Sequence, residues 1–251
     1  MKIAVLGLGE AGSAFARDLL KQGVQVSGWD PEPNVLPEGL ELASSNAEAA
    51  KDADIILSAN LASAALDIAS EVSSVLGPNQ YFAEMNTSSP QLKRDVANAL
   101  DLSGAKVLDV AIMAPVPPQG LATPMYVAGE GTEEFVSMVR PLGMSTTVLD
   151  GGVGTAATYK LVRSIAYKGF AAVVTECLEA AQKLNLEAYA REQLAGLIGD
   201  EKMIDRFVVG SKKHAKRRKH EMEAVKDLLK NIDVSAFTTE ASINRLKELG
   251  G

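Results

Sequence analysis

The chain has 251 residues, 47% of them hydrophobic, and its formal net charge at pH 7 is -7. These values describe a folded globular protein of one large or two modest domains, and they argue against disorder and a general nucleic-acid-binding role. No apolar stretch approaches the roughly 18 residues of a membrane helix and no signal-peptide core is evident, so we expect a cytoplasmic protein with no membrane partner. The single cysteine, Cys177, excludes a disulfide framework, and no Cys and His residues have metal-site spacing.

The first stretch of the chain has the pattern of a strand, a glycine turn and a helix. Residues 1–6, which are apolar from Ile3 to Leu6, have the pattern of a buried parallel strand, and helical apolar spacing extends from Ser13 to Gln22. Between them, Gly7 permits a tight turn, Gly9 lets the backbone approach a pyrophosphate, and Gly12 lets the helix pack closely on the strand. The helix N-terminus favours an anion. The turn is therefore predicted to bind a dinucleotide, through Gly7, Leu8, Gly9, Glu10, Ala11 and Gly12.

The second predicted strand, Val24 to Trp29, ends in Asp30. This acid lies about 20 residues beyond the glycines, where a dinucleotide-binding fold places the carboxylate that binds the adenosine ribose. Taken alone, Gly9 could be an ordinary loop glycine and Asp30 a solvated turn residue, but their combination favours the cofactor. A carboxylate that accepts ribose hydroxyl bonds repels a 2′-phosphate, so we expect NAD in preference to NADP. NADP stays open, because Ser27 or the nearby backbone could accommodate it.

The ends of the next two predicted strands carry polar side chains. Strand Ala53–Ser58 leads into an asparagine, and strand Tyr81–Met85 leads into a run of amide and hydroxyl side chains. Ligands lie off the carboxyl ends of strands in a doubly wound sheet. Asn60 could equally cap the helix that follows it, and Ser89 is predicted to be a cap. The candidate cofactor contacts at these ends are Ser58, Ala59, Asn60, Asn86 and Thr87.

The rest of the first 150 residues continues the alternation of strands and helices. Strands are expected at Lys106–Ile112, Met125–Ala128 and Ser145–Leu149, and a helix at Thr132–Arg140. This alternation predicts an α/β domain, residues 1–150, with a doubly wound parallel sheet. Residues 151–251 have no strand signal. They are expected to form an all-helical domain joined by a long interdomain helix, with helices near 155–184, 188–198, 203–231 and 236–249.

The first long helix carries the residues best placed for proton transfer. Lys160, Ser164 and Lys168 follow at four-residue steps and share a helix face with Tyr167 beside them. A free lysine has a pKa of about 10.4, so a lysine that acts as a base near neutral pH needs partial burial or a cationic neighbour. Arg163 or an oxidised nicotinamide could be that neighbour. The alternative for Lys160 is a solvated surface charge.

Four segments together resemble the β-hydroxyacid dehydrogenase family, the relatives of 6-phosphogluconate and 3-hydroxyisobutyrate dehydrogenases. They are the glycine turn and residues 85–90, 109–115 and 154–162. The resemblance implies a Rossmann-type domain followed by a helical domain, and hydride transfer between a nicotinamide cofactor and a small hydroxy acid. It implies that Lys160 is the general acid and base and that Ser164 orients the substrate oxygen. The chain is most similar to a poorly characterised branch with a shortened C-terminal helical domain.

Three departures from the family pattern affect the expected substrate. The usual Ser-Gly-Gly appears as Met113-Ala114-Pro115, in a loop stiffened by prolines that have no N–H to offer a carboxylate. Ser164 replaces an asparagine, and Ala156 a frequent glycine. Met113, Ala114 and Pro115 remain candidate substrate contacts. Two alternatives stay open: an imine or small-aldehyde reductase, and a nucleotide-binding sensor without turnover.

A basic run on the third predicted helix of the helical domain has three possible interpretations. The run comprises Lys212, Lys213, Lys216, Arg217, Arg218 and Lys219, with His214 and His220 between them. Nucleic-acid binding is disfavoured because the helix continues with acidic residues and no aromatic side chains are interleaved. A solvated helix face is the plain reading. The sharper one is that His214, Arg217 or Arg218 reaches the catalytic site and binds an anionic substrate.

The helical domain also predicts a homodimer. Its apolar positions exceed what one thin helical layer would cover, so a second copy is expected to cover the surplus. These positions are Met203, Ile204, Phe207, Val208, Met222, Val225 and Leu229.

Overall fold

The computed structural model describes residues 1–33 and 35–250. It consists of two compact units, Met1–Thr158 and Tyr159–Gly251. The division falls after Thr158 rather than at Asp150, inside helix α6 (Thr155–Lys183), which begins in the first unit and ends in the second. The two units are described separately.

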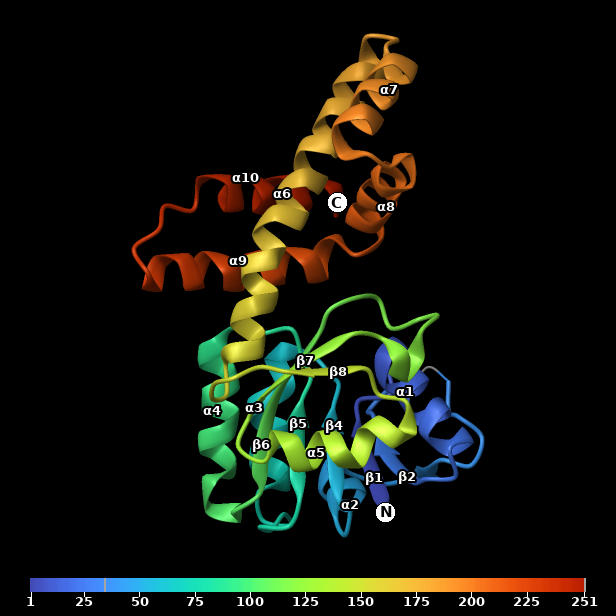
Figure 1. Cartoon of the computed structure of the whole chain (residues 1–251), viewed down its shortest axis with the longest axis vertical. Helices are drawn as coiled ribbons and strands as arrows, with labels where there is room; N and C mark the ends of the chain where they lie inside the picture. The colour runs from blue at the N-terminus through green and yellow to red at the C-terminus, as the bar shows by residue number, and fades with distance from the viewer. Residues whose placement is uncertain (34, 251) are drawn as a thin grey trace. The chain divides into compact units, whose positions relative to one another are not determined.

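The first unit is built on one eight-stranded sheet, with the strand order β3-β2-β1-β4-β5-β6-β7-β8 (Figure 1). Its strands are β1 (Lys2–Leu6), β2 (Gln25–Trp29), β3 (Glu41–Leu42), β4 (Ile55–Ser58), β5 (Tyr81–Glu84), β6 (Lys106–Ile112), β7 (Met125–Gly129) and β8 (Thr146–Val148). Strands β1 to β6 pair in parallel, as the alternating sequence pattern predicts. The predicted fold class, a Rossmann-type α/β unit followed by a helical region, is confirmed.

The expectation of a wholly parallel sheet is wrong at β7. This strand runs antiparallel to β6, while β8 is parallel to β7. A parallel connection needs a crossover of a dozen or more residues, usually a helix. The β6–β7 connection holds only the short 3-10 turn η3 (Gly120–Ala122), so the chain turns back beside β6.

Helices cover both faces of the sheet. Helices α1 (Glu10–Lys21) and α5 (Thr132–Val139) pack on one face, where Phe15 and Phe135 are fully buried. Helices α2 (Asn46–Ala50), α3 (Ala65–Val72) and α4 (Pro90–Leu100) pack on the other, around Phe82. Because residues alternate along β1, Val5 faces the first core and Leu6 the second. Each large side chain buried in this way stabilises the fold by about 1.5–3 kcal/mol. The sheet is therefore a rigid support for the loops at its strand ends.

The second unit contains the rest of α6 with α7 (Glu187–Ile198), α8 (Glu201–Lys213), α9 (Ala215–Asn231) and α10 (Phe237–Leu249). One small core gathers α6, α7 and α8 around Phe207, with Cys177 partly buried against it. A second core joins α6, α9 and α10 around Leu161 and Met222. Among the described residues, no helix is long and apolar enough to span a bilayer.

The predicted single helix 203–231 is wrong, because His214 divides it into α8 and α9. The backbone of His214 has φ -121° and ψ 24°, outside the helical region. The chain then folds back, and the guanidinium of Arg218 lies where a Cβ on Gly210 would be. The run of lysines and arginines around the break has good helix propensity and contains no glycine or proline. Periodicity therefore gave no stop signal there.

The apolar residues on which the dimer expectation was based are covered within this unit. Five are buried and two pack partly buried against the helical cores; they are Ile204, Phe207, Met222, Val225, Leu229, Met203 and Val208. That reason for a dimer is wrong. Large apolar side chains are exposed elsewhere, on α6, at Tyr159, Val162, Phe170 and Val173.

Candidate functional site

The glycine turn leads directly into an uncapped helix. Helix α1 begins at Glu10, three residues before the predicted start at Ser13, and Gly9 is its N-cap residue. Glu10 and Ala11 are good helix formers, and an acidic residue suits the first turn, which explains the earlier start. Among the residues that the structure describes, no side chain caps this end of the helix. Its first amides therefore remain suited to an anion such as a pyrophosphate.

The three glycines of the turn have different reasons to be glycine. Gly7 has φ +97°, and a Cβ there would lie 2.5 Å from the carbonyl oxygen of Ala59. A Cβ on Gly12 would overlap the carbonyl oxygen of Gly7. A Cβ on Gly9 would meet nothing within 4 Å. The packing of the protein itself therefore requires Gly7 and Gly12, whereas Gly9 leaves open space beside the helix end. The cradle fits a dinucleotide.

Asp30 is tied to the glycine turn. Its Oδ2 accepts a hydrogen bond of 2.7 Å from the backbone N–H of Leu8, and its Oδ1 accepts one of 2.8 Å from Glu32. The side chain of Leu8 is buried in the sheet core, so only its backbone belongs to the turn. A carboxylate has about four acceptor sites, so Asp30 retains capacity for ribose hydroxyls. The predicted acid therefore lies beside the predicted turn.

A hydrogen-bonded network joins the ends of β4 and β5. Asn60 Nδ2 donates to Ser58 Oγ at 2.9 Å, and Asn86 Nδ2 donates to Asn60 Oδ1 at 2.8 Å. The cap alternative for Asn60 is wrong, because the next turn, η1 (Ala62–Ala64), starts after Leu61 and has no side-chain cap. Asn86 Oδ1 is buried and has no hydrogen-bond partner among the described residues. An unsatisfied buried acceptor at a strand end is suited to a ligand donor.

The other predicted residues at the ends of β4 and β5 lie outside this network. The N–H of Ala59 donates to the carbonyl of Leu6 at 2.8 Å, which continues the sheet pairing. Thr87 is partly buried just after the network. Ser89 Oγ accepts from the N–H of Leu92 at 3.2 Å, so the predicted cap of α4 is confirmed.

A buried cluster of three charges, absent from the sequence prediction, lies in the first unit. Lys93 Nζ forms ion pairs with Glu84 and, at 3.2 Å, with Asp109 Oδ1, and all three side chains are 0–1% exposed. Burial alone lowers the pKa of Lys93, but the charges of Glu84 and Asp109 outweigh it and raise that pKa. Burial raises the pKa of Glu84, against the opposing charge of Lys93. The ammonium therefore offsets the two carboxylates.

Asp109 also holds the start of helix α6. Its Oδ2 accepts hydrogen bonds from the N–H groups of Gly154, at 3.1 Å, and Ala157, at 2.9 Å. A carboxylate at a helix N-terminus is stabilised by the free amides and by the helix dipole. Asp109 therefore caps α6 from the neighbouring strand.

The signal for this cluster was present in the sequence. Lys93 shares the buried face of α4 with Val96 and Leu100, where a lysine is unexpected. Glu84 and Asp109 stand inside otherwise apolar strands. Charges at core positions are seldom fully buried unless paired, so three of them in one domain predict a buried ion-pair cluster.

In the second unit, Glu221 of α9 binds the predicted catalytic face of α6. Ser164 Oγ and Lys168 Nζ both donate to Glu221 Oε1, and Lys168 Nζ also donates to Ser164 Oγ at 3.0 Å. Burial raises the pKa of Glu221, but the charges of Lys168 and Lys160 and the hydrogen bonds outweigh it and lower the pKa to about 2. Burial lowers the pKa of Lys168, and Glu221 opposes this. Glu221 is therefore ionised, and its carboxylate fixes Ser164 one turn after Lys160.

Tyr167 is surrounded by cations. The charged groups of Arg163, Lys168 and Arg218 lie 5.6, 5.9 and 5.5 Å from its ring centroid. Phe207 packs edge-on against the same ring, with centroids 5.1 Å apart. The ring quadrupole attracts each cation.

The basic run does not enter this cluster as a set. Arg218 lies over Tyr167, while Arg217 is exposed and His214 sits at the break between α8 and α9. Of the basic run, the guanidinium of Arg218 joins the side chains around Tyr167.

The loop that departs from the family pattern offers little backbone to a ligand. The N–H of Met113 donates to the carbonyl of Pro124 at 2.8 Å, and its side chain packs partly buried near Ala111 and Ala128. Ala114 is half-buried and Pro115 is exposed. Such a loop offers a carboxylate fewer free amides than two glycines would.

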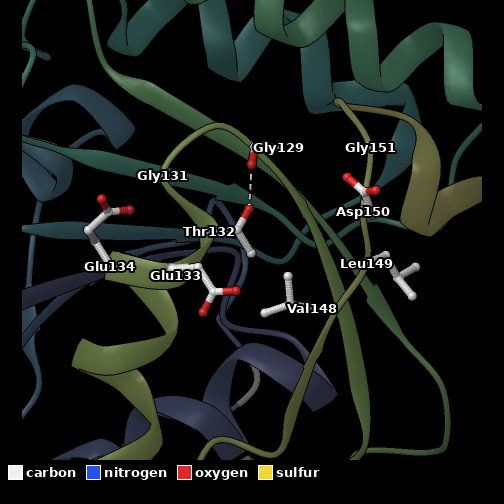
Figure 2. A pocket seen from close by; sticks show the side chains of 9 residues that line it. All are labelled: Gly129, Gly131, Thr132, Glu133, Glu134, Val148, Leu149, Asp150 and Gly151. Carbon is white, nitrogen blue, oxygen red and sulfur yellow. Dashed lines mark hydrogen bonds between the residues drawn. The ribbon is translucent and has the colours of Figure 1, made fainter.

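Figure 2 shows a cavity of about 630 Å³ whose lining includes none of the predicted site residues. It is lined by Gly129, Gly131, Thr132, Glu133, Glu134, Val148, Leu149, Asp150 and Gly151. Thr132 Oγ1 donates to the carbonyl of Gly129 at 2.5 Å. Three carboxylates and no cation line this cavity, so it would repel a dinucleotide phosphate. The cradle at the glycine turn is the better cofactor site.

The parallel sheet, the uncapped glycine turn and the acid beside it define a Rossmann-type dinucleotide-binding protein. Residues 2–142 match the family model of the NAD-binding domain of 6-phosphogluconate dehydrogenase. The chain belongs to this family, and the resemblance to the β-hydroxyacid dehydrogenases is confirmed. Membership supports a nicotinamide cofactor and an oxidoreductase in general.

Three relatives indicate the range of this family. An uncharacterised 28.5 kDa protein of Methanothermus fervidus is 24% identical over 99% of both chains. Mouse mitochondrial 3-hydroxyisobutyrate dehydrogenase is 25% identical, over 65% of this chain and 52% of that protein. Escherichia coli 3-sulfolactaldehyde reductase is 27% identical, over 73% of this chain and 65% of that protein. The chain thus spans about half to two thirds of the relatives whose activity is named.

Solved structures share the fold. A Mycobacterium tuberculosis 3-hydroxyisobutyrate dehydrogenase with L-serine has a TM-score of 0.79 at 19% identity, over 98% of this chain and 92% of that one. An imine reductase of Myxococcus stipitatus with NADP+ has a TM-score of 0.65, also at 19% identity, over 99% of this chain and 93% of that one. At these identities the likeness establishes the architecture alone.

Proposed function

We propose that the protein is an NAD(P)-dependent oxidoreductase that transfers hydride between the nicotinamide and a small hydroxy acid or its carbonyl counterpart. The observation that carries this proposal is the α6 face on which Lys160 precedes Ser164 by one turn, with Ser164 fixed by the ionised Glu221. Family membership and the two relatives named as a dehydrogenase and a reductase support it. The glycine turn supplies the cofactor cradle.

In this proposal, residues of the second unit transfer the proton at the substrate oxygen. Lys160 takes the proton from the substrate hydroxyl during oxidation and returns it to the carbonyl oxygen during reduction. Ser164 already donates its proton to Glu221 and accepts from Lys168, so one lone pair remains; the reacting hydroxyl gives its only hydrogen to Lys160, and this lone pair accepts from a second donor of the substrate. Because Glu221 holds this rotamer, the lone pair keeps a fixed direction.

The residues of the first unit hold the cofactor. When bound, the nicotinamide supplies the hydride acceptor or donor. The first amides of α1 bind the pyrophosphate and Asp30 binds the adenosine ribose, which favours NAD over NADP. Asn86 Oδ1, buried without a partner among the described residues, accepts a hydrogen bond from the ligand.

The test is turnover on a panel of hydroxy acids, aldehydes and imines with both cofactors, followed by the absorbance of the reduced nicotinamide. Lys160→Ala should lower kcat by on the order of 10² or more and leave cofactor affinity unchanged, as expected for a proton-transfer group. Lys216→Ala, an exposed lysine of α9, is the matched control. Equal turnover of Lys160→Ala and the wild type would refute the role of Lys160.

A second candidate is an imine or small-aldehyde reductase. It is favoured by the loop at Met113, whose amide is already bonded to Pro124 and whose Pro115 has none. Reduction of an imine or a neutral aldehyde needs hydride delivery and a proton, but no carboxylate cradle. Higher kcat/KM for neutral aldehydes or imines than for hydroxy acids in the same panel would select it. A protein that binds NAD(H) but turns over nothing would be the sensor instead.

We also propose that the protein is a homodimer. The support is the row of large exposed apolar side chains on α6, among them Phe170 and Val173 at about 60% exposure. A contiguous exposed apolar patch is typical of an interface.

A further inference from the structure

Arg218 is a half-buried cation whose close contacts are neutral. Its Nη1 donates to Ser211 Oγ at 3.0 Å, and its guanidinium lies over the ring of Tyr167. Among the residues that the structure describes, no carboxylate forms a salt bridge with it. By contrast, Arg191 and Arg245 each pair with two carboxylates. A partly buried guanidinium without a counter-ion is costly, and an anion would relieve that cost.

The nearest acid is already committed. Glu221 lies one turn after Arg218 on α9, but its carboxylate accepts from Lys168 and Ser164. The charge of Glu221 therefore offsets that of Lys168. Burial lowers the pKa of Arg218, and Tyr167 and the charge of Glu221 oppose this only in part. Lys168 and Arg218 thus lie near one carboxylate, and it is Lys168 that forms the salt bridge with it.

The guanidinium of Arg218 is packed against helix α8. Gly210 has no side chain, and the space that its Cβ would fill is taken by the guanidinium of Arg218. The break at His214 brings α9 back over this glycine. A guanidinium has five N–H donors, and Ser211 accepts from one of them. Donors remain for a carboxylate or sulfonate, which arginine binds with two parallel hydrogen bonds.

We propose that Arg218 is the specificity residue that binds the oxyanion group of the substrate, a carboxylate or a sulfonate, beside the α6 face that carries Lys160 and Ser164. This inference rests on the proposed function. It assigns carboxylate or sulfonate binding to one side chain of the helical unit, since the proline-containing loop at Met113 offers few free amides for it.

The kinetic test compares three small alcohols: 3-hydroxypropionate, 2-hydroxyethanesulfonate and the neutral 3-hydroxypropionamide. In Arg218→Gln, KM for an anionic substrate should rise about 10- to 100-fold, the value of a charge-assisted hydrogen bond, while kcat changes little. KM for the amide should not change. Arg218→Lys keeps the positive charge but loses the two parallel N–H donors. Its KM for an anionic substrate should therefore lie between those of the wild type and Arg218→Gln. The anion that shows the larger effect, carboxylate or sulfonate, identifies the natural group.

Arg206→Gln is the matched control, because Arg206 is an exposed arginine of α8 and its loss changes the net charge equally. Its KM values should equal those of the wild type. If Arg218→Gln is poorly folded by its melting temperature, Arg218→Lys carries the comparison, with an expected rise in KM of about 3- to 10-fold. Unchanged KM for both anions, or an equal rise for anions and amide, would overturn the proposal.

A binding experiment tests the anion site independently of the proposed reaction. Malonate is titrated calorimetrically into the wild type, Arg218→Gln and Arg206→Gln at constant ionic strength. We expect an affinity at least 10-fold lower in Arg218→Gln alone. Malonate binding that depends on Arg218 in a protein without turnover would refute the proposed function and support the anion site. Turnover in which neither KM nor malonate binding depends on Arg218 would support the proposed function and refute the anion site.

Discussion

Glu84 of β5 and Asp109 of β6 are register partners in the sheet, and both carboxylates contact the ammonium of Lys93. Two buried acids on neighbouring strands would repel each other without this cation. Because Asp109 also accepts the first amides of α6, the pair connects the sheet to the helix that carries Lys160. Lys93 therefore contributes to the stability of both the sheet and the start of α6.

Lys93→Met should destabilise the protein by about 3–5 kcal/mol, because two buried carboxylates lose their counter-charge. Urea unfolding measures this change. Adding Glu84→Gln to Lys93→Met should recover part of the loss, since one of the two charges is then gone. The exposed Lys51→Met should stay within about 0.5 kcal/mol of the wild type. A loss below about 1 kcal/mol in Lys93→Met would contradict the structure.

Gly9→Ala and Gly12→Ala should have opposite effects. A methyl group on Gly12 overlaps the carbonyl of Gly7, so this variant should lose stability and melt at a lower temperature. A methyl group on Gly9 meets open space, so that variant should fold like the wild type. It should nevertheless bind NADH at least about 10-fold more weakly, because the methyl group stands where a pyrophosphate approaches. Melting curves and NADH fluorescence titration measure both. Wild-type affinity in Gly9→Ala would show that the cofactor lies elsewhere.

The contribution of Glu221 to stability should depend on pH. Its pKa is about 2 in the folded protein and 4.5 ordinarily. The ionised group therefore stabilises the fold above pH 4.5, by about 3 kcal/mol, and this contribution is lost as the pH falls from 4.5 towards 2. Urea unfolding of the wild type and Glu221→Gln at several pH values measures the difference between them. The gap should be largest near pH 7 and shrink below pH 4.5. A gap that stays constant with pH would mean that Glu221 is not held ionised.

The proposed dimer should have twice the 26.4 kDa mass of one chain in light scattering. Phe170→Glu places a charge in the exposed apolar row of α6 and should yield monomers with an unchanged helical signal. Leu102→Glu, on the exposed turn η2 (Asp101–Ser103) of the first unit, should leave the mass unaltered. A wild-type protein that is monomeric at tens of micromolar would remove the proposal.

The sequence predicted the features of the fold that depend on short contiguous patterns. Strands β1, β4, β5 and β6, of four to seven mostly apolar residues, were recognised because each is buried on both faces. The direction of β7 was missed because it depends on the preceding connection. Residues 113–124 form no crossover helix, and the residues of β7 itself do not indicate this. The break at His214 was missed because no helix-breaking residue marks it.

The candidate site divides in the same way. The glycine turn and Asp30 were found because the motif has a fixed spacing and a mechanism. Glu221 was missed, since it is 57 residues from Ser164 and helical periodicity does not say which helices meet. Lys93 could have been found, because a lysine on an apolar helix face requires a buried acid.

The hydrogen bonds of Asp30 bear on any attempt to change the coenzyme preference. A replacement at residue 30 chosen to admit an additional phosphate would also release the amides of Leu8 and Glu32. The glycine turn would then lose the hydrogen bonds that hold it as well as the charge that repels a 2′-phosphate. A useful redesign would therefore supply a new acceptor for the Leu8 amide before it supplied a new cation.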